Sequence, residues 1–340
     1  MPKAFPRGRI CWDELMTTDP KAATAFYKAI VGWGTQESGG GSSYVMWTAG
    51  GTPVGGLMAL PDEARMMGTP PSWVMYVAVP DVDASLRQAV SLGARAYVQP
   101  QSIPTMGRFA VLGDPQGATF ALFSSTTGVP GHDGPSKPGE FSWHELAATD
   151  WRAAWDFYEH LFGWVKMDAM DMGPAGTYQM FGRAGKMLGA MYDKPPEMTG
   201  PPNWLCYALV PNADSAATVV QRLGGKVMNG PMDIPGGRIA QCMDAQGATF
   251  ALHSNAPQAE AAPKPKRRAE KAVKTLAKQP ARKEAKAARK GEKAAKKAAK
   301  KAMKAAKKAA KKARKAIKKA AKKARKAAKK ARRKAAPRGR

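Results

Sequence analysis

The chain has 340 residues and a formal net charge of +29, which is enough length for two domains of ordinary size. Of its 55 Lys and Arg residues, 37 lie from Ala261 onward, with only 3 of the 26 acidic residues, so a mildly acidic body precedes a strongly basic tail. The N-terminal segment lacks a continuous apolar run, which argues against a signal peptide or membrane anchor. Three cysteines without CxxC spacing favour buried, reduced thiols. We therefore expect a cytoplasmic protein.

The body is an internal duplication. The segment CWDELMTTDPKAATAFYKAIVGW (11–33) returns as SWHELAATDWRAAWDFYEHLFGW (142–164), and DPQGATFAL (114–122) returns as DAQGATFAL (244–252). We expect two similar domains, residues 8–125 and 139–255. A Pro/Gly-rich linker, 126–138, joins them, and the basic tail covers 256–340.

Each copy reads as strand, helix and further strands, twice over. In the first copy a strand over 9–16 leads to Asp19, a good N-cap, and to a helix that Gly32 ends. Strands follow over 44–48 and 54–59. A second cycle begins with WVMYVAV, continues in a helix over 84–92 that Gly93 ends, and closes with two strands joined by the tight turn DPQG. Each copy therefore contains two βαβββ units.

This arrangement resembles the vicinal oxygen chelate superfamily, which contains glyoxalase I, bleomycin-resistance proteins and extradiol dioxygenases. The resemblance covers about residues 8–255 and is carried by the strand–Asp–FY–GW opening and the closing DPxG hairpin. It implies an α+β fold of two tandem glyoxalase-like domains. In each domain the paired βαβββ modules would form a curved-sheet cup, followed here by a disordered or conditionally helical tail.

The resemblance also implies where a divalent metal would bind. The first-strand ligand position corresponds to Trp12 and Trp143, the middle position to Val74 and Leu205, and the last-strand position to Ala121 and Ala251. None of these residues supplies a metal-binding donor atom. His144 lies one residue beyond its position, so alternation along a strand predicts that it points to the helix-covered side. We expect no metal cofactor; a divalent metal is the alternative if the strand register differs.

The same alternation places aromatic and polar side chains in the predicted cups, a composition suited to a small organic ligand. The residues expected to line them are Trp12, Glu14, Tyr76 and Thr119 in the first domain, and Trp143, Glu145, Tyr207 and Thr249 in the second. Such aromatic residues also serve as ordinary core.

Two further interpretations concern the carboxylates. Arg108 and Arg238 stand in matching positions and could pair with Glu14 and Glu145. Alternatively, Glu145 and His253 could act as a catalytic acid–base pair, which would make the protein a lyase, hydroxylase or dioxygenase.

The tail contains three consecutive Lys/Ala-rich units of eleven residues from Ala298. Its composition resembles that of linker-histone tails, and it has no aromatic residue for base stacking. Charge repulsion favours disorder when it is free, and binding to DNA or RNA would be independent of sequence. The residues expected to contact nucleic acid are Lys300, Lys301, Lys304, Lys307, Lys308, Lys311, Lys312, Arg314, Lys315, Lys318, Lys319, Lys322, Lys323, Arg325 and Lys326.

The sequence thus predicts a metal-free, glyoxalase-like protein that binds a small organic ligand and is associated with the nucleoid through its tail. The alternatives are a metal-dependent or acid–base enzyme of the same superfamily, and a DNA-compacting protein whose body is a structural anchor. If the tail lay on a membrane as a helix, its apolar face would be mainly alanine, which is too weakly hydrophobic for insertion. The oligomeric state, monomer or homodimer, stays open.

Overall fold

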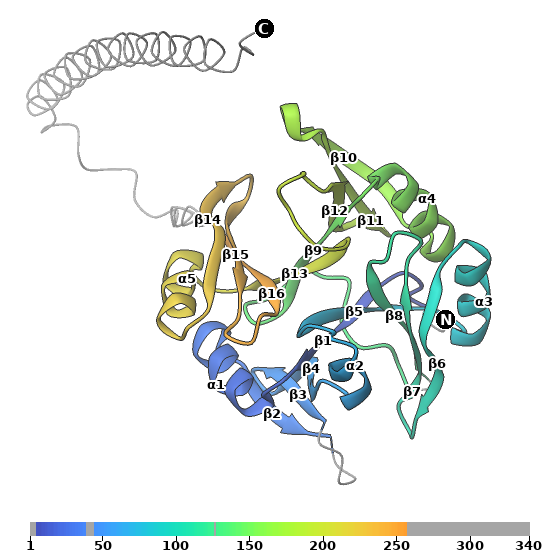
Figure 1. Cartoon of the computed structure of the whole chain (residues 1–340), viewed down its shortest axis with the longest axis horizontal. Coiled ribbons are helices and arrows are strands. Elements are labelled where there is room, and N and C mark those ends of the chain that lie inside the picture. Colours follow the sequence, from blue (N-terminus) through green and yellow to red (C-terminus); the bar gives the residue numbers. More distant parts are fainter. Residues whose placement is uncertain (1–4, 39–43, 126, 257–340) are drawn as a thin grey trace, which may run out of the picture. The chain divides into compact units, whose positions relative to one another are not determined.

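The computed structural model describes residues 5–38, 44–125 and 127–256. The predicted basic tail lies outside the described residues, apart from Ala256. In the described part, two eight-stranded sheets follow one another along the chain, and each is built from two βαβββ units as predicted (Figure 1). No helix in this part is long and apolar enough to cross a membrane.

The first sheet has the strand order β2-β3-β4-β1-β5-β8-β7-β6. Its elements are β1 (Ile10–Thr17), α1 (Pro20–Val31), β2 (Gly34–Glu37), β3 (Val45–Ala49), β4 (Thr52–Ala59), α2 (Asp62–Met66), β5 (Ser72–Ala78), α3 (Val82–Ser91), β6 (Arg95–Ile103), β7 (Gly107–Gly113) and β8 (Thr119–Ser125).

The second sheet repeats this topology in the order β10-β11-β12-β9-β13-β16-β15-β14. Its elements are β9 (Phe141–Ala148), α4 (Trp151–Phe162), β10 (Val165–Asp171), the short helix η1 (Gly173–Ala175), β11 (Thr177–Arg183), β12 (Lys186–Asp193), β13 (Asn203–Leu209), α5 (Ala213–Arg222), β14 (Lys226–Ile234), β15 (Gly237–Met243) and β16 (Thr249–Asn255).

The first helix of each copy begins and ends where the sequence predicts. The Asp19 side chain accepts a hydrogen bond from the backbone N–H of Ala22, and Gly32 ends α1 with φ of 83°. Asp150 and Gly163, with φ of 68°, do the same for α4. The helix α3 begins two residues earlier than predicted, because Asp81 rather than a later residue caps it.

The two copies share their cores. One apolar cluster joins α3 and strands of the first sheet to α4 and strands of the second sheet. The other cluster joins α1 and strands of the first sheet to α5 and strands of the second sheet. Figure 1 shows α1 beside α5 and α3 beside α4. Each copy therefore completes its hydrophobic core with the helices of the other.

Buried hydrogen bonds between the copies come in reciprocal pairs. Tyr27 donates to Asp244 at 3.1 Å, and the equivalent Tyr158 donates to Asp114 at 3.0 Å. The Trp33 indole donates to the carbonyl of Gly139, and the equivalent Trp164 donates to that of Gly8, each at 2.7 Å. This is the contact pattern of a two-fold symmetric dimer, realised within one chain.

Asp13 and His144, which occupy equivalent positions in the two copies, meet in the same interface. Their side chains are nearly fully buried, and Nε2 of His144 lies 2.9 Å from Oδ1 of Asp13. His144 thus lies on the face opposite Glu145, as strand alternation predicts.

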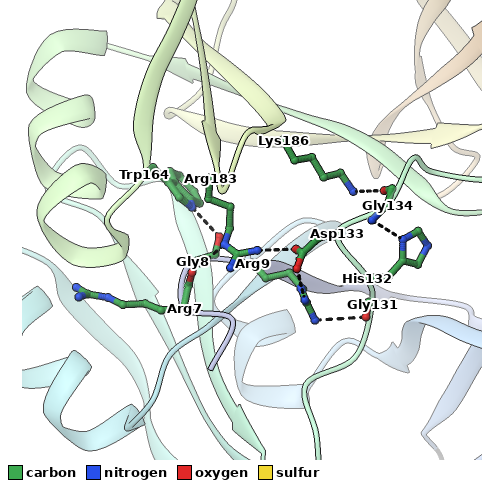
Figure 2. Close-up of polar contacts among 10 residues, drawn as sticks. All are labelled: Arg7, Gly8, Arg9, Gly131, His132, Asp133, Gly134, Trp164, Arg183 and Lys186. Atoms are coloured by element: carbon green, nitrogen blue, oxygen red, sulfur yellow. Dashed lines mark hydrogen bonds and ion pairs between the residues drawn. The ribbon is translucent and has the colours of Figure 1, made fainter. Parts of the chain in front are cut away.

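The linker is fastened to both copies through Asp133 (Figure 2). This carboxylate pairs with Arg9 at 2.6 Å and with Arg183 at 2.5 Å, and both arginine side chains are mostly buried. Lys186 donates to the carbonyl of Gly134 at 2.8 Å. These contacts hold the first strand of one copy and the β11–β12 turn of the other against the same short segment.

Candidate ligand-binding site

The predicted site residues lie side by side on the face of each sheet that is turned away from the helices. At the centre of the first sheet, Trp12 pairs with Tyr76 and Glu14 with Val74, while Tyr76 pairs with Ala121 on its other side. Trp143, Glu145 and Tyr207 repeat this register in the second sheet. In an antiparallel pair, directly opposed side chains share a face, so Trp, Glu and Tyr converge.

In the first domain these side chains and one loop residue form what we call the Glu14 cluster: Trp12, Glu14, Tyr44 and Tyr76. The Tyr76 hydroxyl donates to Oε1 of Glu14 at 2.8 Å. The Trp12 indole donates to the Tyr44 hydroxyl at 2.9 Å, and Tyr44 in turn hydrogen-bonds Glu14. Glu14 is buried at the base of this cluster, with 7% of its surface exposed.

The second domain repeats the arrangement as the Glu145 cluster: Trp143, Glu145, Tyr178, Tyr207 and Gln241. Tyr178 donates to Oε1 of Glu145 at 2.5 Å and Tyr207 to Oε2 at 2.7 Å. The Trp143 indole donates to Tyr178 at 2.8 Å, and the Gln241 amide to Tyr207 at 3.0 Å. Glu145 is 6% exposed.

The direction of these hydrogen bonds is fixed by tryptophan, since an indole N–H can only donate. The Tyr178 oxygen accepts from Trp143, so its own proton is directed to Glu145. Both carboxyl groups therefore accept hydrogen bonds from neutral tyrosine hydroxyls. Burial nevertheless raises the pKa of Glu14 and of Glu145, and the tyrosine hydrogen bonds only partly offset that rise.

The residues at the metal-ligand positions do not fit a divalent metal. These positions hold tryptophan, an aliphatic residue and alanine in both sheets, and the observed register keeps them there. Within the described ranges there is also no group of three or more His, Cys, Asp and Glu side chains that could bind an ion. Each cluster offers only one carboxylate, which is too few ligands for a stable site.

The arginine interpretation was wrong. Arg108 pairs with Asp83 at 2.7 Å, and Arg238 pairs with Asp214 at 2.8 Å and with Asp233 at 2.5 Å. Both guanidinium groups bind the acidic residue in the first turn of the neighbouring helix, α3 or α5, instead of reaching the opposite face of the sheet.

The remaining predicted residues lie at the edges of the clusters. His253 hydrogen-bonds the Ser142 hydroxyl through Nδ1 at 3.0 Å, and burial lowers the pKa of its imidazole. Thr119 and Thr249 are half-buried at the first residue of β8 and β16, two residues before Ala121 and Ala251. All three cysteines, Cys11, Cys206 and Cys242, are free and buried, as predicted.

Three residues of these clusters were not predicted from the sequence: Tyr44, Tyr178 and Gln241. Tyr44 and Tyr178 stand in equivalent places, just before β3 and within β11, but insertions between the copies change their spacing from that of the flanking repeats. A local alignment on YVMW and YQMF would have matched them. Gln241 occupies the position of Val111 in the first copy, so comparison of the two repeats does not indicate a polar residue there.

The two clusters have different surroundings. Around Glu14 the neighbours are apolar and include Phe109, Val111 and Phe123. Around Glu145 the corresponding positions hold Ile239, Gln241 and His253. Tyr192 adds a further ring that stacks on Tyr178 with centroids 5.9 Å apart. The carboxyl group is thus common to both sites, while the side chains beside it are not.

Paired βαβββ units with aromatic and polar side chains on one sheet face define the class of protein, and family models match both copies. A glyoxalase-like domain matches residues 9–123, and the glyoxalase/bleomycin resistance protein/dioxygenase superfamily matches residues 141–252. The chain belongs to the glyoxalase/bleomycin resistance protein/dioxygenase superfamily.

Relatives of two kinds are similar in sequence. "Putative glyoxylase CFP32" of Mycobacterium tuberculosis is 43% identical over 117 residues, which are 34% of this chain and 43% of that protein. The chain thus matches less than half the length of this relative. Anthracycline biosynthesis protein DnrV of Streptomyces peucetius is 28% identical over 272 residues, covering 73% of this chain and 94% of that protein.

Solved structures share the fold. The Mn(II)-bound glyoxalase from Novosphingobium aromaticivorans has a TM-score of 0.50 at 16% identity, covering 74% of this chain and 83% of its own. The 2,3-dioxygenase LapB from Pseudomonas sp. KL28 has a TM-score of 0.53 at 12% identity, covering 74% and 94%. At these identities the likeness concerns the fold alone.

Proposed function

We propose that the Glu14 and Glu145 clusters each bind a small organic molecule with an aromatic or apolar body, without a metal ion. The observation that carries this proposal is a buried carboxyl group that accepts hydrogen bonds from two tyrosines, one of which accepts in turn from a tryptophan, in both copies. Packing alone needs no carboxyl group there, and burying one is costly. The names of the Streptomyces relatives, anthracycline biosynthesis proteins, support an organic ligand.

Ligand screening by thermal unfolding of the full chain tests this proposal. A panel of small aromatic compounds should contain some that raise the unfolding temperature, because binding to the folded state alone is stabilising. Those compounds should lose most of their effect on a Trp12→Ala, Trp143→Ala double variant. Tyr97→Ala, at a residue that is 50% exposed, is the control and should respond like the wild type. An undiminished response of the double variant would contradict binding at these clusters.

A second candidate is acid–base catalysis at Glu145. It is favoured by the raised pKa of this carboxyl group, which brings a general base closer to neutral pH. His253 stays a proposed partner, although its hydrogen bond is to Ser142. Mass spectrometry of each stabilising compound after incubation distinguishes a chemically changed ligand from a merely bound one. Glu145→Gln should abolish any such change.

For the tail, we propose sequence-independent binding to DNA or RNA; the support is the composition of residues 261–340. Truncation after Gln258 should abolish binding to duplex DNA. In the full chain, binding should weaken steeply as salt concentration increases, because each neutralised phosphate releases counterions. Equal affinity of the truncated chain would refute a role of the tail. If DNA compaction by the tail were the protein's whole function, truncation after Gln258 would abolish that function, while a Glu14→Ala, Glu145→Ala variant would retain it.

A further inference from the structure

The hydrogen bonds of the two clusters are arranged for an ionised carboxylate. In the Glu145 cluster, the Tyr178 oxygen already accepts from Trp143 and the Tyr207 oxygen from Gln241. Both hydroxyl protons are then directed at Glu145. A proton on the carboxyl group itself would meet hydroxyl groups that are already accepting a hydrogen bond and donating one. In the Glu14 cluster Trp12 likewise donates to Tyr44, while Val111 occupies the position of Gln241, so within the described ranges the donor to the second tyrosine is present in the Glu145 cluster alone.

No cationic side chain among the described residues balances these charges. All ion pairs of the described part involve other carboxylates, and the groups that act on the pKa of Glu14 and Glu145 are neutral donors. Arginine pairs with Asp62, Asp83, Asp133, Asp214 and Asp233. The buried Asp114 and Asp244 have no cationic partner in this part of the chain either, but each accepts two backbone N–H groups and a tyrosine hydroxyl, whereas the hydrogen bonds of Glu14 and Glu145 come from side chains alone. A buried carboxylate ordinarily has an ionic partner.

The carboxylates also have acceptor capacity left. An ionised carboxylate has about four lone-pair directions. Glu14 uses two of them, for Tyr44 and Tyr76, and Glu145 uses three, for Tyr178, Tyr207 and the longer contact from Gln241 at 3.4 Å. Among the described residues, at least one direction at each glutamate therefore has no donor.

The side chains around the carboxylates are aromatic rings, whose faces attract cations. Trp143, Tyr178 and Tyr192 contribute rings around Glu145, and the charge of Glu145 acts on Tyr192 directly. Tyr76 and Phe109 lie together beside Glu14, with ring centroids 6.3 Å apart. A carboxylate surrounded by such rings matches the charge and shape of an ammonium group attached to an apolar body.

We propose that the ligand of the two clusters carries a protonated amine, whose N–H groups donate to Glu14 or Glu145 while the rings contact its charged head. This inference rests on the proposed function, because it names the class of ligand for those same sites. The ammonium group supplies the missing positive charge, and the tyrosines hold the carboxylate in position to receive it.

Tryptamine and tryptophol provide a matched pair of probes, since they differ in an ammonium against a hydroxyl on the same aromatic body. Calorimetric titration of the full chain should show that tryptamine binds at least about tenfold more tightly than tryptophol. Glu14→Gln and Glu145→Gln should each remove one tryptamine site, and the double variant should bind the two probes equally. Glu63→Gln, which makes the same charge change at an exposed position, should leave both sites intact.

The outcomes separate the two proposals. If tryptophol binds the wild type as tightly as tryptamine, the amine proposal is overturned while the proposed binding of an organic molecule stands. A preference for tryptamine that persists in the double Gln variant, with the variant shown to be folded by its thermal unfolding, overturns the amine proposal as well. If neither probe binds the wild type, the amine proposal fails, while the thermal-unfolding panel decides the proposed binding of an organic molecule independently.

Discussion

At the scale of single residues, Glu14 and Glu145 combine a cost in stability with a proposed role in binding. Their pKa values are raised above those of exposed glutamates, chiefly by burial. Because each carboxyl group binds its proton more tightly in the folded state than in the unfolded chain, protonation stabilises the fold. This stabilisation is fully present below the pKa of the unfolded chain and is lost as pH rises through the pKa of the folded state. The two sites therefore weaken the fold at neutral pH, where both carboxyl groups are increasingly ionised.

We predict that the Glu14→Gln, Glu145→Gln variant is at least as stable as the wild type at neutral pH, by up to about 2 kcal/mol. The amide keeps the shape of the side chain and removes its charge, and the amide oxygen can still accept from Tyr76 or Tyr178. As pH is lowered from about 8 to about 5, the wild type should gain stability relative to the variant. Urea unfolding at several pH values measures the difference, in which the effects of all other titrating groups cancel.

The exposed Glu63→Gln variant is the control, and its stability difference from the wild type should stay flat over the same pH range. If the stability difference of the double variant also stayed flat, the two carboxyl groups would titrate alike in the folded and unfolded states, and burial would not raise their pKa.

At the scale of secondary-structure elements, the crossed packing of helices depends on a buried chain of hydrogen bonds in each copy. Trp204 donates to the Tyr158 hydroxyl at 2.9 Å, and Tyr158 donates to Asp114 in the other copy. Trp73, Tyr27 and Asp244 form the equivalent chain. In this way α1 and α4 are joined to the closing turn of the opposite sheet.

We predict that Tyr158→Phe and Tyr27→Phe each destabilise the protein by about 1–3 kcal/mol, because each leaves a buried indole N–H and a carboxylate oxygen without a partner. Chemical denaturation provides the measurement, and the two variants should have similar costs since their surroundings are equivalent. Tyr97→Phe at an exposed position is the matched control. A cost no greater than that of the control would show that these hydroxyl groups do not hold the copies together.

The elements themselves could be predicted from the sequence, whereas their partners could not. Alternation along β1 and β9 was enough to place Trp12, Glu14, Trp143 and Glu145 on one face, and the capping residues located α1 and α4. A repeat does not reveal that a helix packs on the other copy rather than its own. Pairing of Arg108 and Arg238 was misjudged for a related reason: each is on the strand next to a helix whose first turn offers a nearer acid.

At the scale of the whole molecule, the shared cores make the two domains depend on each other. Each apolar cluster contains buried side chains from both copies, so separation would expose large apolar surfaces on each. Burial of apolar surface contributes about 25 cal/mol per Å² to folding. A single copy would lose a large part of that contribution.

We predict that residues 1–138 expressed alone do not form a stable monomer, and that they fold on mixing with residues 139–258. Circular dichroism and size-exclusion chromatography of each half and of the mixture measure this. A mixture of the two halves in which Tyr27→Phe and Tyr158→Phe are combined should assemble more weakly. Independent, cooperative unfolding of the first half as a monomer would contradict the shared-core description.

The pair formed by Asp13 and His144 has a consequence for the choice of partner. These two residues occupy equivalent positions, so if a domain met a second copy of itself in the same way, aspartate would face aspartate or histidine would face histidine. Two buried carboxylates would repel and have no proton to share, and two histidines would lose the carboxylate acceptor that Asp13 provides. The first half of the chain is therefore chemically complementary to the second and mismatched to itself. This asymmetry at one buried position favours the pairing of a first half with a second half over the pairing of two first halves or of two second halves.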